Sequence, residues 1–257
     1  MEKDSYEHGV PSWVDLMTSD PAGAAQFYAG LFGWDVQQGP PEAGGYAIAH
    51  LRGRAVAGIG PLQNPGPPVW STYVSVDDAD QVAEAATANG GKVLMPPMDV
   101  LDAGRGAILA DPAGAVISLW QPGSHPGAGI VNEPGTYCWS ELVTTDLAGS
   151  KAFYKAVLGW GVESYGPEGP GGYAEFQVGG RAVAGMMAMP PGAPPMPPHW
   201  GVYFAVADAD AGVARIRELG GQIMVEPRDI EPGRFAVAAD PQGAAFQLLA
   251  LKEDTAS

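Results

Sequence analysis

Two carboxylates occupy the same place in two copies of one sequence pattern, each two residues after a tryptophan. Asp15 lies in WVDLMTSDPAGAAQFYAGLFGW (13–34), and Glu141 lies in WSELVTTDLAGSKAFYKAVLGW (139–160). A carboxylate beside a tryptophan in an apolar site has a raised pKa and can act as a general base. The alternative is structural: the acid is bonded to backbone donors or paired with Arg105 or Arg234. We take Asp15 and Glu141 as the catalytic candidates.

Each candidate stands on a predicted strand that leads into a capped helix. Residues 13–18 alternate between two faces, as a strand requires. Asp20 is a helix-capping residue, Pro21 suits the first helical position and Gly33 is a typical stop. The second copy repeats this arrangement from Asp146. Because strand residues alternate, each carboxylate and its tryptophan share one face.

The two copies belong to a tandem duplication with a shift of about 126 residues. After the first helix, each copy continues with a turn-rich segment (37–45 in the first), a hairpin and a proline-rich spacer. A second capped helix and three strands complete the copy. The pattern predicts an α+β fold with four β-α-β-β-β units. The predicted organisation is a loose N-terminal lead-in (1–11), module 1 (12–121), a linker (122–136), module 2 (137–252) and a tail (253–257).

Composition narrows the range of partners. The chain has 257 residues, a formal net charge of −16 and a pI near 4.4, which argues against nucleic acids and anionic membranes. The single cysteine, Cys138, excludes an intrachain disulfide and fits a reducing compartment. The first ten residues lack a signal pattern, and no apolar run has the length of a membrane span. We expect a cytoplasmic protein.

The order of motifs resembles the vicinal oxygen chelate superfamily, which includes glyoxalases, extradiol dioxygenases and bleomycin-binding proteins. The resemblance rests on the FY-bearing helix with its LFGW or VLGW stop, the V-x-D-A-D helix start and the D-P-x-G-A final strand, and it covers nearly the whole chain twice. It is closest to a two-module type described as a glyoxalase or hydroxylase. It implies that each pair of units curls its sheet around a cavity, and that the chain is a monomer with internal pseudo-dimer symmetry or a homodimer.

The same resemblance locates the usual metal ligands, which here are absent. At the positions where this superfamily usually has its histidine and glutamate ligands, module 1 has Trp13, Ser71 and Ser118. Module 2 has Trp139, Gly201 and Gln247 at these positions. A catalytic metal normally needs about three N, O or S ligands. We therefore predict no metal and no cofactor. One alternative stays open: a divalent metal held by His199, Glu141 and Gln247. His8 and His125 fall in the lead-in and the linker, where surface positions are expected.

A small-molecule ligand is the expected partner, because aromatic side chains around one polar group commonly build such sites. Arg105 and Arg234 are candidates for binding an anionic oxygen. The predicted function is a glyoxalase-like protein that binds a carbonyl-bearing or aromatic metabolite. Two alternatives remain: a non-catalytic protein that sequesters an antibiotic or metabolite, and a natural-product tailoring enzyme. The predicted ligand-binding residues are Trp13, Tyr73, Arg105, Ser118, Trp120, Trp139, Tyr203, Arg234 and Gln247.

Overall fold

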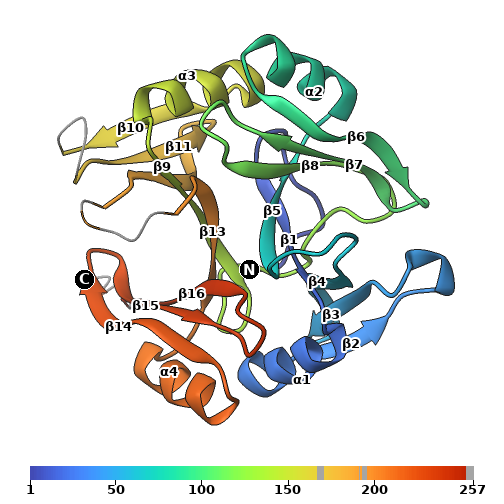
Figure 1. The fold of residues 1–257 in the computed structure, drawn as a ribbon, viewed down its shortest axis with the longest axis vertical. Coiled ribbons are helices and arrows are strands. Elements are labelled where there is room, and N and C mark those ends of the chain that lie inside the picture. Colours follow the sequence, from blue (N-terminus) through green and yellow to red (C-terminus); the bar gives the residue numbers. More distant parts are fainter. Residues whose placement is uncertain (167–170, 191, 193–195, 253–257) are drawn as a thin grey trace.

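The computed structural model describes residues 1–166, 171–190, 192 and 196–252. Within these residues the chain forms two eight-stranded sheets of identical topology (Figure 1). The strand orders are β2-β3-β4-β1-β5-β8-β7-β6 and β10-β11-β12-β9-β13-β16-β15-β14. The predicted α+β fold of two tandem modules and four β-α-β-β-β units is confirmed. The curling of each sheet around a cavity stays a prediction.

The first sheet and its helices lie within residues 11–122. In chain order they are β1 (Pro11–Thr18), α1 (Pro21–Phe32), β2 (Asp35–Gln38), the 3₁₀ turn η1 (Pro41–Ala43), β3 (Ala47–Leu51), β4 (Arg54–Pro61), β5 (Val69–Ser75), α2 (Ala79–Ala88), β6 (Lys92–Val100), β7 (Gly104–Ala110) and β8 (Val116–Pro122).

The second sheet and its helices lie within residues 137–251. They are β9 (Tyr137–Thr144), α3 (Leu147–Leu158), β10 (Gly161–Tyr165), β11 (Tyr173–Val178), β12 (Arg181–Ala188), β13 (His199–Ala205), α4 (Ala209–Glu218), β14 (Gln222–Ile230), β15 (Gly233–Ala239) and β16 (Ala245–Leu251). None of the helices in the described residues is long and apolar enough to span a membrane.

The first helix of each module begins and ends as the sequence predicts. The Asp20 side chain accepts a hydrogen bond from the Gly23 amide, and Gly33 ends α1 in the left-handed conformation, at φ 74°. Asp146 caps α3 in the same way. The turn prediction for 37–45 is wrong at its start, because β2 reaches Gln38. That strand is short and mostly exposed, so no buried alternation marks it in the sequence.

The two modules share their hydrophobic cores. Helices α2 and α3 contact each other on one side of the molecule, and α1 and α4 contact each other on the opposite side (Figure 1). One core cluster joins Phe27 of α1 to Phe246 of β16, and the other joins Leu119 of β8 to Phe153 of α3. Each core therefore combines one unit from each module, so neither module buries its apolar surface alone.

Two repeated sequence motifs form hydrogen bonds between the modules. The Tyr28 hydroxyl on α1 donates to Asp240 at 3.3 Å, and the Tyr154 hydroxyl on α3 donates to Asp111 at 3.3 Å. Each bond joins the FY motif of one module to the D-P-x-G turn of the other. Burial raises the pKa of both aspartates, and backbone amides of the same turns oppose that shift. The FY and D-P-x-G motifs therefore have structural roles at the module interface.

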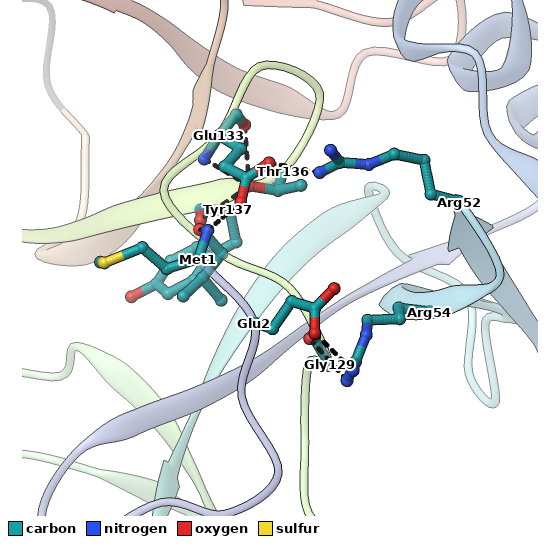
Figure 2. Close-up of polar contacts among 9 residues, drawn as sticks. Met1, Glu2, Arg52, Arg54, Gly129, Glu133, Thr136 and Tyr137 are labelled. Carbon is teal, nitrogen blue, oxygen red and sulfur yellow. Dashed lines mark hydrogen bonds and ion pairs between the residues drawn. The ribbon is translucent and has the colours of Figure 1, made fainter.

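The lead-in is not loose, because it pairs with the linker. Glu2 forms a β-bridge with Ile130, and the Met1 amino group donates to the Val131 carbonyl at 2.7 Å. Figure 2 shows this region, where Glu133 bonds both the Met1 amino group and Arg52. Charged side chains that look like a solvated run in the sequence thus hold the linker against β3 and β4.

Candidate functional site

Asp15 is the centre of a buried polar cluster in module 1, which we call the Asp15 cluster. Its side chain is only 2% exposed, and Oδ2 accepts hydrogen bonds from the Tyr73 hydroxyl at 2.9 Å and the Tyr46 hydroxyl at 3.2 Å. Oδ1 is buried without a hydrogen-bond partner in the described structure. Burial raises the pKa of Asp15 to about 7, although both tyrosine hydrogen bonds lower it. Asp15 is thus held by hydroxyl groups and not by an arginine.

A glycine makes room for this arrangement. Gly58 on β4 pairs with Asp15 on β1. A Cβ atom at Gly58 would collide with the Tyr46 hydroxyl, which also accepts a hydrogen bond from Trp13 Nε1 at 3.0 Å. Ser118 lies beside Tyr73 on the neighbouring strand and bonds its hydroxyl. The Asp15 cluster is therefore a connected hydrogen-bonded network in which Oδ1 of Asp15 has no partner among the described residues.

His125 closes the Asp15 cluster, and the prediction of a surface position for this residue is wrong. Its ring packs edge-on against Trp13 at 4.5 Å and against Trp120 at 5.9 Å. Trp120 Nε1 donates to the His125 carbonyl at 2.8 Å. The ring atom Nε2 is buried without a partner among the described residues, and burial lowers the pKa of the imidazole. The prediction of a surface position failed because His125 lies in a Gly- and Pro-rich stretch whose residues show no periodicity.

Glu141 is the centre of the equivalent arrangement in module 2, the Glu141 cluster. The Tyr203 hydroxyl donates to Oε1 at 3.0 Å. Burial raises the pKa of Glu141, and hydrogen bonds from Tyr203 and Tyr173 oppose the rise. Glu141 and Trp139 are both half-buried, whereas Asp15 and Trp13 are almost fully buried. The carboxylate and the tryptophan are therefore more accessible in module 2.

Glycines flank Glu141 on both neighbouring strands. Gly185 on β12 and Gly201 on β13 each pair with Glu141. A Cβ atom at Gly185 would meet the Tyr173 hydroxyl, Trp139 Nε1 and Glu141 Oε2, so these polar atoms converge above it. Above Gly201 lies the amide of Gln247, at 2.7 Å from where a Cβ would be. The amide oxygen Oε1 of Gln247 is buried without a partner in the described part of the chain.

The predicted arginines lie away from both clusters. Arg105 on β7 bonds Asp80 of α2 at 2.7 Å and Asp99 of β6 at 2.9 Å. Arg234 makes the equivalent pairs with Asp210 at 2.6 Å and Asp229 at 3.1 Å. These contacts orient both guanidinium groups toward the second helix of their module. The structure therefore brings together the predicted residues Trp13, Asp15, Tyr73, Ser118 and Trp120 in one cluster and Trp139, Glu141, Tyr203 and Gln247 in the other.

The sequence-based predictions missed Tyr46 and Tyr173. A repeated signal was present: GGY opens the hairpin in both modules, at 44–46 and 171–173. The tyrosine comes after a turn and precedes an apolar strand, as expected of the first residue of a hairpin. Only the cross-strand register shows that its hydroxyl reaches the carboxylate two strands away.

The donor groups at the expected metal-ligand places do not fit a divalent metal. Trp13 Nε1 is committed to Tyr46, and Gly201 has no side chain. His199 pairs with Val143 on β9, and its Nδ1 lies 3.0 Å from the Pro197 carbonyl. Across the described ranges, no three His, Cys, Asp or Glu side chains come close enough to hold a metal ion. The described residues at these places therefore do not supply a ligand set for a divalent metal.

A surface hollow of about 350 Å³ lies elsewhere, between the end of α1 and the start of α4. Its two charged residues already have partners. Asp208 caps α4, and Arg215 bonds the Gly30 carbonyl at 3.0 Å and Glu218 at 2.9 Å. The hollow offers an open apolar surface without an available reactive group, so the two carboxylate clusters remain the candidate sites.

Comparison with known proteins identifies relatives along the whole chain. The family model of the Glyoxalase/Bleomycin resistance protein/Dioxygenase superfamily matches residues 11–119 and 135–248. A Mycobacterium tuberculosis protein named as a glyoxylase, CFP32, is 45% identical over 256 residues, covering 96% of this chain and 97% of that protein. The anthracycline biosynthesis protein DnrV of Streptomyces peucetius is 40% identical over 265 residues, covering 96% and 95%.

Solved structures share the fold at low sequence identity. The Mn(II)-bound glyoxalase from Novosphingobium aromaticivorans has a TM-score of 0.64 and 17% identity, covering 96% of this chain and 84% of that chain. The 2,2',3-trihydroxybiphenyl 1,2-dioxygenase from Sphingomonas wittichii has a TM-score of 0.62 and 15% identity, covering 95% and 90%. These likenesses establish the fold alone.

Proposed function

The chain belongs to the Glyoxalase/Bleomycin resistance protein/Dioxygenase superfamily, and we propose that it binds a small carbonyl-bearing or aromatic metabolite at the Glu141 cluster. The observation that carries this proposal is the surroundings of Glu141. A half-buried carboxylate held by tyrosine hydroxyls stands between two glycines, and the polar groups of Tyr173, Trp139 and Gln247 converge over these glycines beside it. Among the described residues it has no basic partner. Hydrogen bonds offset the cost of burying this carboxylate only in part, because its pKa stays raised, and this favours a role for it in binding a ligand.

The proposed chemistry is proton transfer by Glu141. Because burial raises its pKa, the carboxylate can accept a proton from a ligand carbon next to a carbonyl and return it elsewhere. The hydroxyls of Tyr173 and Tyr203 stay protonated, since burial and the nearby Glu141 charge raise their pKa values. These hydroxyls donate to the Glu141 carboxylate, and once Glu141 has accepted the proton they can donate instead to the carbonyl oxygen, where negative charge develops. This route needs no metal.

Two alternatives keep the same site. A non-catalytic protein that sequesters its ligand is favoured by the unpaired Gln247 Oε1 acceptor of the described structure, which contributes to binding but to no proton transfer. A natural-product tailoring role is favoured by the anthracycline biosynthesis proteins, which match 96% of the chain. Both alternatives predict ligand binding at the Glu141 cluster, and they differ in whether the bound ligand is converted.

The test combines binding with turnover. Binding of an anthraquinone alcohol is measured by equilibrium dialysis, and turnover is measured with the methylglyoxal–glutathione hemithioacetal before and after chelation, with elemental analysis of the same sample. We expect Glu141→Gln to abolish turnover while retaining most of the affinity. The matched variant Asp15→Asn should retain both, because the Asp15 cluster is closed.

Each result has a distinct meaning. Binding without turnover in the wild type supports sequestration. Unchanged turnover in Glu141→Gln eliminates the acid–base role. Near-stoichiometric metal with chelator-sensitive turnover contradicts the metal-free proposal. Absence of binding in the wild type contradicts the site itself.

A further inference from the structure

The Glu141 cluster continues across the second sheet as a row of carboxylates. Glu163 on β10 pairs with Glu175 on β11, Glu175 pairs with Gly185 on β12, and Gly185 pairs with Glu141 on β9. We call Glu163, Glu175 and Glu141 the carboxylate row. The equivalent positions of the first sheet are occupied by Gln37, Ile48, Gly58 and Asp15. Module 2 thus carries three acids where module 1 carries one.

The carboxylate row lies on one face of the sheet together with aromatic rings. The Tyr173 hydroxyl reaches above Gly185 beside Glu141, so Tyr173 shares the face of Glu141. Glu175 is two residues further along the same strand and therefore lies on that face too. The Tyr165 hydroxyl donates to Glu175 at 3.1 Å, and the rings of Tyr165 and Tyr173 lie 6.4 Å apart at 34°.

The partners of the row are all neutral. Glu163 accepts from the Gln177 amide at 2.6 Å, and Glu175 and Glu141 accept from tyrosines. No lysine or arginine of the described residues forms an ion pair with any of the three. Like charges directly opposite on neighbouring strands destabilise a sheet. Folding alone therefore gives no reason for Glu163 to face Glu175.

The tyrosine side chains respond to this charge. Desolvation raises the pKa of Tyr165 to about 12, and Glu175 and Glu163 both add to the rise. Burial likewise raises the pKa of Tyr173, with contributions from Glu141 and Glu175. The pKa of each tyrosine is therefore affected by two members of the row.

The geometry points to a positively charged ligand: we propose that the carboxylate row and the rings of Trp139, Tyr165 and Tyr173 bind an aromatic compound that carries a protonated amine. This inference rests on the proposed function and adds the charge of the ligand. Aromatic faces and carboxylates both attract a cation. The buried Gln247 Oε1 beside Glu141 also calls for a hydrogen-bond donor. The row spreads over three strands and is therefore suited to an extended organic cation, whereas a metal ion needs converging ligands.

Three anthraquinones with the same rings and different charges test the proposal. The cation is 2-(aminomethyl)anthraquinone, the neutral compound is 2-(hydroxymethyl)anthraquinone, and the anion is anthraquinone-2-carboxylate. Equilibrium dialysis at low salt measures each affinity for the full chain. We expect the cation to bind about tenfold tighter than the neutral compound and the anion to bind most weakly. About 1 M salt should reduce the difference.

Two double variants test whether the carboxylate row causes the preference for the cation. Glu163→Gln with Glu175→Gln should bring the cation-to-neutral ratio close to one. The control pair, Glu42→Gln with Glu84→Gln, removes the same charge from two exposed positions and should keep the ratio. Circular dichroism checks that both proteins are folded.

Equal wild-type affinities for the cation and the neutral compound would overturn the cationic ligand and leave the proposed function standing. An equal loss of the ratio in the control pair would also overturn it, because net charge would then explain the preference. Failure of all three compounds to bind would contradict both proposals.

Discussion

The Asp15 and Glu141 clusters are two versions of one hydrogen-bonded frame, and they differ in access. In both, a tryptophan N–H, two tyrosine hydroxyls and a carboxylate meet above a glycine. His125 packs against Trp13, whereas Trp139 joins no aromatic pair among the described residues. Variants of the two copies can therefore separate what the frame contributes to folding from what its surroundings contribute to binding.

The largest expected difference between the clusters is in the pH dependence of stability. Burial raises the pKa of Asp15 from 3.8 to about 7, so the folded protein binds a proton that the unfolded chain has lost. Stability contributed by the protonated form is present below pH 4 and is lost as the pH rises toward 7, by about 4 kcal/mol. Asp15→Asn should remove this loss. The free energy of unfolding of the variant should therefore rise relative to that of the wild type as the pH rises. Denaturant unfolding at a series of pH values measures the gain.

Glu141→Gln is the matched control for that experiment. Its pKa shift has the same direction and cause, but the side chain is half-buried, so the pH-dependent gain should be smaller. Equal gains in the two variants would contradict the difference in access. If Asp15→Asn showed no gain between pH 4 and pH 7, its carboxyl would titrate normally in the folded protein.

Truncating the two tryptophans tests the same difference through packing. Trp13 is 4% exposed and packs in a core cluster, so Trp13→Ala should destabilise the protein by about 3 kcal/mol. Trp139→Ala should cost about half of that, because its ring is already partly solvated. Urea unfolding with an unchanged m-value is the measurement. A larger loss for Trp139→Ala would mean that the Glu141 cluster is the more tightly packed of the two.

The sequence predicted the repeated elements well and the closure of the sites poorly. Strand alternation and the caps at Asp20 and Asp146 are local signals, and both appear in the structure. The contact of His125 with Trp13 joins residues that are distant in the chain, and no local pattern encodes it. Whether Asp15 and Glu141 act on a ligand stays a prediction.

The predicted arginines illustrate a different limit. Arg105 and Arg234 come directly after a glycine at equivalent strand starts, which is all that the sequence shows of their surroundings. Strand parity decides whether such a residue faces the carboxylate or the helix, and the first residues of a strand give too little alternation to determine that parity. In the structure each pairs with two aspartates, one of them on the helix.

Gly58 and Gly185 occupy equivalent positions in the two clusters, and alanine substitutions there should differ least in their effect on stability. A Cβ at Gly58 would collide with the Tyr46 hydroxyl, which is bonded to both Trp13 and Asp15 and cannot move without breaking these bonds. Gly58→Ala should therefore cost about 2 kcal/mol. At Gly185 a Cβ would overlap the Tyr173 hydroxyl less severely than a Cβ at Gly58 overlaps the Tyr46 hydroxyl, so Gly185→Ala should cost less, about 1 kcal/mol.

For ligand binding, Gly185→Ala should have the larger effect and Gly58→Ala the smaller one, the opposite of the order expected for stability. The added methyl group at Gly185 displaces the polar side chains beside Glu141, so Gly185→Ala should weaken binding of the anthraquinone alcohol, while Gly58→Ala should leave it unchanged. Thermal unfolding and equilibrium dialysis on the same two samples test both halves. If Gly58→Ala were the variant that lost binding, the ligand would have to enter module 1, and His125 would then have to leave Trp13 to admit it. Because that movement would also expose the Asp15 carboxyl, such a result would be accompanied by a fall in the pKa of Asp15 when ligand is added.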